Sequence, residues 1–211
     1  KKYTYAIKQH ADFKAQTLEC EFTGMLLKIQ SFEVWTTLVG NFNAQNLLSV
    51  YAAADLLGLS SLSILKGISE LKNVEGRFYV FQSENNITVV IDYAHTPDAL
   101  FNVLSTINII RTRNENLITV VGCGGNRDQE KRPMMGEKAV LLSDKVIFTS
   151  DNPRDEDPAI IIEDMIKGVP PEHYKKTIKV ILREEAIIMA GQLAKPGDIV
   201  LIAGKGHEQY Q

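Results

Sequence analysis

The chain has 211 residues, of which 45% are hydrophobic and 23% charged, a composition typical of a soluble globular protein. Its 23 Lys and Arg residues against 26 Asp and Glu residues exclude a strongly basic nucleic-acid-binding surface and an acidic tail, so a small-molecule partner is predicted. No apolar run approaches the roughly 20 residues of a membrane helix, and no apolar signal core follows the first lysines, which predicts a cytoplasmic protein. Cys20 and Cys123 lie far apart and match no metal or redox spacing, so we predict buried thiols and no metal site.

The first 75 residues are predicted to form an antiparallel sheet edge followed by two helices. Two alternating segments and two helical segments are expected, in the order 19–29, 33–39, 44–57 and 61–71. One sheet edge and two helices have little core of their own. Residues 1–75 are therefore predicted to be part of an incomplete domain, with a boundary near residues 73–77.

From Gly76 onward, short β-branched runs alternate with amphipathic stretches, a pattern that predicts βαβ units and a mostly parallel sheet with flanking helices. The predicted strands are 77–82, 87–92, 117–122, 145–149, 177–181 and 198–203. The predicted helices are 97–110, 131–142, 158–167 and 183–193. Asn85-Asn86 marks a hairpin turn between the first two strands. The predicted fold class is thus α/β.

Four polar loops follow four of these strands and are expected at one edge of the sheet, where ligands bind in open α/β folds. They are Asp92-Tyr-Ala-His-Thr-Pro97, Gly122-Cys-Gly-Gly-Asn-Arg-Asp128, Asp151-Asn-Pro-Arg154 and Gly204-Lys-Gly-His-Glu208. The second loop fails the dinucleotide-binding spacing because Arg127 occupies the place of the third glycine. The mixture of cationic and acidic side chains instead indicates a site for a zwitterion.

The tetrad Asp151-Asn152-Pro153-Arg154 joins a strand end, a turn and a forked cation. A guanidinium held at this edge matches a carboxylate with two parallel hydrogen bonds. The alternative is an ordinary loop arginine paired with Asp155 or Asp157. His95 and His207 of the neighbouring loops could likewise be ordinary loop histidines with satisfied hydrogen bonds. No nucleophile with an activating base accompanies them.

Taken together, the four loops and Lys131-Arg-Pro133 resemble, in order and spacing, the carboxyl-terminal part of the Mur ligase family. Within it they resemble the branch that adds the third amino acid to the peptidoglycan stem peptide. Gly40-Asn-Phe-Asn43 with Asn46, and Gly76-Arg77, resemble the end of the family's central domain and its domain junction. The resemblance implies that residues 1–75 are the end of an ATP-binding central domain. Residues 76–211 would be a Rossmann-like amino-acid-binding domain, truncated at its end.

The resemblance also implies an activity in cell-wall biogenesis, and hence in cell shape and division. Family members use ATP and Mg²⁺ to phosphorylate the terminal carboxylate of UDP-N-acetylmuramoyl-L-alanyl-D-glutamate, and the incoming amine then attacks the acyl phosphate. The amino acid would be meso-diaminopimelate, the protein a monomer, and neither nucleic acid nor membrane a partner. In that branch the tetrad recognises the distal amino-carboxylate, with Arg154 on the carboxylate and Asn152 beside it. By the same implication Arg127 contacts a ligand carboxylate, while Gly204 and Glu208 receive the distal ammonium.

Five further positions match family residues that lie near the nucleotide, and they are Asn46, Arg77, Asp92, Tyr93 and His95. The chain departs from the family in containing no phosphate loop, since Gly204-Lys205-Gly206 is followed by His207 rather than a hydroxyl residue. The chain is therefore expected to be a fragment that lacks catalytic residues and is inactive alone. ATP and Mg²⁺ would be bound mainly by the missing part of the central domain.

Three alternatives to diaminopimelate addition stay open from the sequence. In a lysine-adding ligase, Arg154 would face a bare ammonium, which repels it and offers no anionic partner. A relative of folylpolyglutamate synthetase would take glutamate and leave the tetrad unexplained. A stand-alone domain would bind an amino acid without ligating it.

Overall fold

The structure is a computed structural model that describes residues 1–208, so the last three residues of the predicted second domain lie outside the described part. The chain divides into two compact units, Lys1–Asn73 and Val74–Gln211. No helix among the described residues is long and apolar enough to cross a membrane.

The first unit is a four-stranded sheet covered by two helices. Its strands are β1 (Tyr5–Ala6), β2 (Phe13–Glu21), β3 (Gly24–Ile29) and β4 (Phe32–Thr36), and they lie in that order. β1 pairs with β2 in parallel, and the β2–β3 and β3–β4 pairs are antiparallel. The helices are α1 (Asn41–Leu56) and α2 (Ser61–Glu70), and Ser60 caps α2 by accepting a hydrogen bond from the Ser63 amide.

Two expectations for this unit were wrong. The segment 19–29 is not one strand, because a turn at Phe22–Thr23 separates the end of β2 from β3. The unit also has a core of its own, in which Phe13, Leu27 and Ile29 of the sheet pack with Leu48 and Tyr51 of α1. The predicted segment began at residue 19 and so omitted the start of β2. That start supplies alternate buried residues, Phe13 and Ala15, to the core.

The second unit is built on a six-stranded sheet. Its strands are β5 (Tyr79–Gln82), β6 (Thr88–Asp92), β7 (Leu117–Val121), β8 (Lys145–Phe148), β9 (Thr177–Lys179) and β10 (Ile199–Ala203). Their order is β5-β6-β10-β7-β8-β9, and only the β5–β6 hairpin is antiparallel. Each strand lies within a range that its sequence pattern predicts, and all five residues of β7 are buried, as expected for a central parallel strand.

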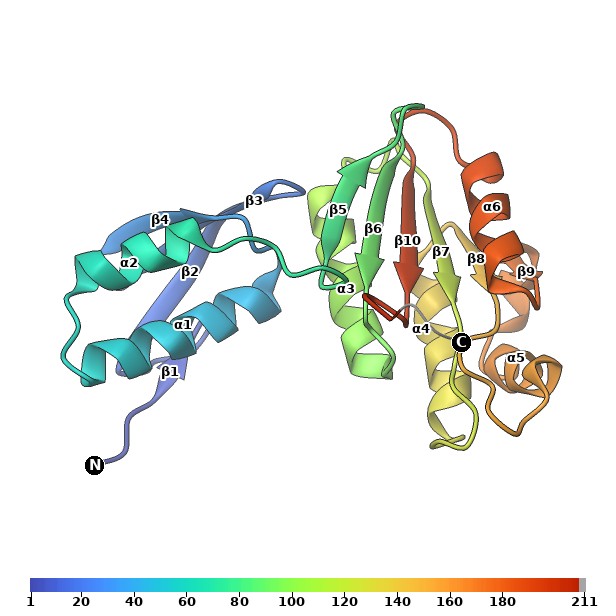
Figure 1. The fold of residues 1–211 in the computed structure, drawn as a ribbon, viewed down its shortest axis with the longest axis horizontal. Coiled ribbons are helices and arrows are strands. Elements are labelled where there is room, and N and C mark those ends of the chain that lie inside the picture. The colour runs from blue at the N-terminus through green and yellow to red at the C-terminus, as the bar shows by residue number, and fades with distance from the viewer. Residues whose placement is uncertain (209–211) are drawn as a thin grey trace. The chain divides into compact units, whose positions relative to one another are not determined.

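Helices flank this sheet on its two faces (Figure 1). They are α3 (Pro97–Ile110), α4 (Lys131–Leu142), α5 (Pro158–Ile166) and α6 (Arg183–Leu193), with a short 3-10 helix at Pro171–Lys176. Ile118 and Val120 of β7 pack in one cluster with Ala186 and Ala190 of α6, whereas the alternate residue Thr119 bonds Ser143 at the end of α4. Since side chains alternate along a strand, α6 and α4 cover opposite faces.

The strand order places the predicted loops together. From β6 the chain moves outward through β7, β8 and β9, and then returns by α6 to lay β10 between β6 and β7. The four parallel strands β6, β10, β7 and β8 are neighbours, so the loops after them lie at one sheet edge. That edge contains the point where the winding direction reverses, which is where open α/β sheets bind ligands.

Candidate functional site

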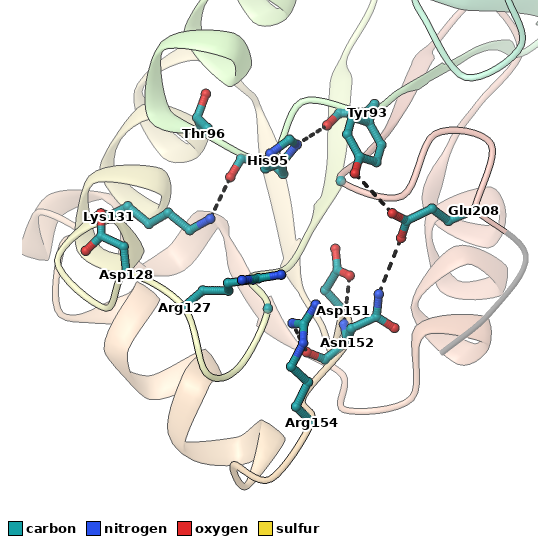
Figure 2. Close-up of a pocket in the computed structure, with 12 residues that line it drawn as sticks. Tyr93, His95, Thr96, Arg127, Asp128, Lys131, Asp151, Asn152, Arg154 and Glu208 are labelled. Carbon is teal, nitrogen blue, oxygen red and sulfur yellow. Dashed lines mark hydrogen bonds between the residues drawn. The ribbon is translucent and has the colours of Figure 1, made fainter.

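A pocket of about 430 Å³ opens at this edge of the second unit (Figure 2). All four loops contribute to its wall. The lining residues are Tyr93, His95, Thr96, Gly124, Arg127, Asp128, Lys131, Asp151, Asn152, Arg154, Gly204 and Glu208. The residues predicted to recognise the amino acid are therefore in one pocket, with the exception of Pro153. The carbonyl of Pro153 accepts a hydrogen bond from the Glu156 amide at 3.0 Å, so this residue shapes the turn instead.

The loop after β8 begins with a buried carboxylate. Asp151 is 7% exposed, and its Oδ1 accepts a hydrogen bond from the Asn152 amide at 2.7 Å. Gly204 lies against the other carboxylate oxygen, where an added Cβ would stand 2.7 Å from Asp151 Oδ2. Gly204 also has φ of 115°, a backbone conformation that other residues rarely adopt. A side chain at position 204 would therefore disturb the floor of the pocket.

Arg154 is exposed at the pocket and is anchored from one side. Its Nη1 donates to the carbonyls of Gly125 at 2.9 Å and Asn152 at 3.3 Å. The carboxylates that an ordinary loop pairing would use are engaged elsewhere, since Asp155 accepts from Asn126 Nδ2 and Asp157 caps α5. Among residues 1–208, no ion pair joins Arg154 to either of them. The guanidinium is thus oriented by carbonyls, and no carboxylate of the described residues forms an ion pair with it.

Glu208 faces Arg154 across the pocket and connects two loops. Its Oε1 accepts from the Tyr93 hydroxyl at 3.1 Å, and its Oε2 accepts from Asn152 Nδ2 at 3.3 Å. Figure 2 shows the Glu208 carboxylate hydrogen-bonded to both Tyr93 and Asn152. A carboxylate and a guanidinium in one pocket can hold the ammonium and the carboxylate of one amino acid.

Lys205 supports Asn152 from the next loop. Its Nζ donates to Asn152 Oδ1 at 3.1 Å and lies 3.9 Å from Asp151 Oδ1. The Lys205 side chain is only 11% exposed. Burial lowers the pKa of Lys205, and the Asp151 carboxylate acts against that effect.

The opposite end of the pocket carries His95 and Lys131, with Arg127 between the two ends in the view of Figure 2. Lys131 Nζ donates to the His95 carbonyl at 3.0 Å, and His95 Nδ1 bonds the Tyr93 carbonyl at 2.8 Å. Arg127 is exposed on the loop after β7. Besides the end formed by Arg154 and Glu208, the pocket therefore has a second end where two cations, Arg127 and Lys131, accompany the carboxylate of Asp128.

A buried arginine holds the loop that carries Arg127. Arg132 is fully buried, with Nη2 donating to Glu156 at 2.8 Å and Nη1 donating to Asp164 at 3.0 Å. Glu156 also accepts from the Asn126 amide at 2.5 Å. The Asn126 amide, followed by the Arg132 guanidinium, lowers the pKa of Glu156. Through Glu156, Arg132 thus ties the start of α4 to the two pocket loops that follow β7 and β8.

Of the residues predicted to lie near a nucleotide, Tyr93 and His95 line the pocket, while the other three do not. The Arg77 guanidinium stacks over the Tyr93 ring at 4.2 Å. Asp92 is buried and accepts from the amides of Phe78 and Ala94, both at 2.7 Å. Burial raises the pKa of Asp92, and those two hydrogen bonds act against the increase. Asn46 is exposed on α1 of the first unit.

Sequence reasoning missed several pocket residues, and they are Thr96, Gly124, Asp128 and Lys131. All four lie inside or beside the four loop motifs, so their closeness to a motif could have identified them as pocket residues. No group of three His, Cys, Asp or Glu residues within the described 1–208 could hold a metal ion, so no Mg²⁺ site is assigned to these residues.

Comparison with known proteins identifies the family of the chain. The family described as "Mur ligase, glutamate ligase domain" matches residues 76–206. The chain belongs to the Mur ligase family. The match spans the sheet from its first hairpin to Gly206, and so includes three pocket loops in full and the loop after β10 up to that residue, two positions before Glu208.

Individual Mur ligases extend the similarity to the whole chain. The chain is 49% identical over all 211 residues to the UDP-N-acetylmuramoyl-L-alanyl-D-glutamate--2,6-diaminopimelate ligase of Bacteroides thetaiotaomicron, and covers 44% of that protein. A solved structure of a ligase with the same name is 39% identical, with a TM-score of 0.65, over 99% of this chain and 43% of that one. The chain thus spans less than half the length of these relatives.

A folylpolyglutamate synthase from Thermotoga maritima also matches, with a TM-score of 0.66 over 92% of this chain and 44% of that one. Its sequence identity is only 20%, so this likeness shows a shared fold alone.

Proposed function

We propose that this chain is the amino-acid-recognising part of a cytoplasmic, monomeric, ATP-dependent ligase that adds meso-diaminopimelate to UDP-N-acetylmuramoyl-L-alanyl-D-glutamate. In this proposal residues 1–75 are the end of the ATP-binding central domain and residues 76–211 form the amino-acid-binding domain. ATP phosphorylates the acceptor carboxylate, and the amine of the amino acid displaces phosphate to form the amide. Mg²⁺ and most contacts to ATP belong to parts of the enzyme outside this chain.

The proposal rests on the presence of both Arg154 and Glu208 in the wall of one pocket. The distal end of meso-diaminopimelate bears both a carboxylate and an ammonium. Arg154 and Asn152 would take the carboxylate, and Glu208 with the Gly204 backbone would take the ammonium. Arg127 would take the second carboxylate of the ligand.

The same charges argue against lysine as the substrate. Lysine ends in a bare ammonium, so the guanidinium of Arg154 would lose its anionic partner and meet a like charge. A site built around a polar group rejects the analogue that lacks it by several orders of magnitude. We therefore expect lysine to bind weaker than meso-diaminopimelate by about two orders of magnitude or more.

Calorimetric titration of the chain with each amino acid tests this specificity. The proposal predicts saturable binding of meso-diaminopimelate, weakened about 10- to 100-fold in Arg154→Ala by loss of charged hydrogen bonds. Lys175→Ala, which removes an exposed cation that does not line the pocket, should bind as the wild type does. Equal affinity for lysine, or unchanged binding in Arg154→Ala, would contradict the proposal.

A further inference from the structure

Lys205 has no role in the function proposed above and does not line the site pocket, although it contacts a residue that does. Lys205 lies on the loop after β10, and its ammonium contacts the loop after β8 at Asn152 and Asp151. Its side chain is almost entirely buried. A largely buried cation is costly unless polar groups hold it, and one of its partners is the amide of Asn152, which lines the pocket.

The chemistry of the two side chains allows only one arrangement. An ammonium has three donors and no acceptor, whereas the Asn amide has an acceptor oxygen on one side and a donor nitrogen on the other. Lys205 therefore requires Asn152 Oδ1 to face it, as it does at 3.1 Å. This contact turns Asn152 Nδ2 toward Glu208 Oε2, 3.3 Å away, on the pocket side.

We propose that Lys205 is a positioning residue that locks the orientation of the Asn152 amide, so that its NH₂ group faces the distal carboxylate of the amino acid. The inference rests on the proposed function for the identity of the ligand. Glu208 favours the same orientation only while its carboxylate is available to Asn152. When a ligand ammonium engages Glu208, Lys205 keeps the amide in place.

The reversed amide shows why this orientation bears on specificity. With Lys205 removed, the amide can rotate and present Oδ1 to the pocket. That oxygen would repel a ligand carboxylate and attract an ammonium. Lys205 would then contribute to the preference for meso-diaminopimelate over lysine without contacting either ligand.

The first test is a spectroscopic signature of the free protein. In the ¹⁵N-labelled chain, the Asn152 side-chain NH₂ protons should show nuclear Overhauser effects to the Glu208 side chain. Lys205→Met, which keeps the length of the side chain but not its donors, should weaken or abolish them. Lys205→Arg, which keeps donors, should retain them. An unchanged Asn152 signal in Lys205→Met would overturn the inference, whether or not any ligand binds.

The second test is calorimetry with two named probes. Lys205→Met should weaken meso-diaminopimelate binding about tenfold, as expected for one hydrogen bond turned unfavourable, and change L-lysine binding by less than about threefold. An equal loss for both ligands would contradict a role in orienting Asn152 and indicate general disruption of the pocket. If the wild-type chain does not bind meso-diaminopimelate, the proposed function fails, while the Asn152 signal still decides the role of Lys205.

Discussion

Arg132 connects two of the four pocket loops, those after β7 and β8. Its guanidinium joins Glu156 and Asp164, and Glu156 in turn holds the Asn126 amide. The two carboxylates are 22% and 21% exposed, so the network is screened less than a surface pair and more than a fully buried one. The loss of unfolding free energy on replacing Arg132 should therefore lie between the losses expected for a surface ion pair and for a fully buried one.

Arg132→Met is predicted to lower the free energy of unfolding by about 2–3 kcal/mol, because it leaves Glu156 without its cation and Asp164 with Lys167 alone. Lys179→Met is a matched control, since it removes a pair with Glu163 in which both side chains are about half exposed. The control should cost less than about 1 kcal/mol. Urea unfolding measures both, and equal losses in the two variants would contradict the account.

Glu156 also makes a pH-dependent contribution to stability. Its pKa in the folded chain lies below the ordinary value of 4.5, so its charged form stabilises the fold. That stabilisation is fully present above pH 4.5 and is lost as the pH falls through the lowered pKa. The difference in unfolding free energy between wild type and Glu156→Gln should therefore stay constant from neutral pH to about pH 5. It should shrink at lower pH, whereas a difference that does not vary with pH would refute this role.

Among the elements, α4 and α5 pack closely at one glycine. A Cβ at Gly136 of α4 would lie 1.9 Å from the Met165 carbonyl oxygen of α5, so no larger residue fits without moving a helix. Gly191 of α6 provides the contrast, because nothing lies within 4 Å of the position that a Cβ would take there. The two helical glycines thus differ in the space around them.

Alanine substitution at these two positions should have opposite effects. Gly136→Ala is predicted to lower the free energy of unfolding by about 1–3 kcal/mol through overpacking. Gly191→Ala is predicted to raise it by about 0.5–1 kcal/mol, because alanine favours the helix and no contact opposes it. Thermal or urea unfolding of the pair checks this, and effects of the same sign would show that the packing of α4 on α5 is not as described.

Helices and strands were predicted correctly where the periodic segment was long and capping residues or proline marked its ends. The bounds of α3 match the structure, since Pro97 and the Thr96 cap define its start. The two-residue strand β1 is too short to carry a period, and the start of β2 was missed because a polar alternating segment resembles a loop. The place of β10 between β6 and β7 could not be predicted, because local patterns contain no information on strand order.

At the scale of the whole molecule, the motifs identified the pocket, and the fold supplied the contacts between them. Lys205 and Asn152 are 53 residues apart, and Tyr93 and Glu208 are 115 apart, so neither pair could be recognised from spacing. The charges of Arg154 and Glu208 were visible in the sequence, whereas the partners that orient them were not. The prediction of a zwitterion site therefore came from residue types, and its geometry from the sheet.

Recognition of meso-diaminopimelate by this pocket can be measured by mapping the bound ligand onto the protein. Titration of the ¹⁵N-labelled chain should shift amide signals of the loops at 122–128, 151–154 and 204–208, and leave the first unit unchanged. Lysine at the same concentration should shift them far less. No shift in these loops with meso-diaminopimelate, or equal shifts with lysine, would contradict the account.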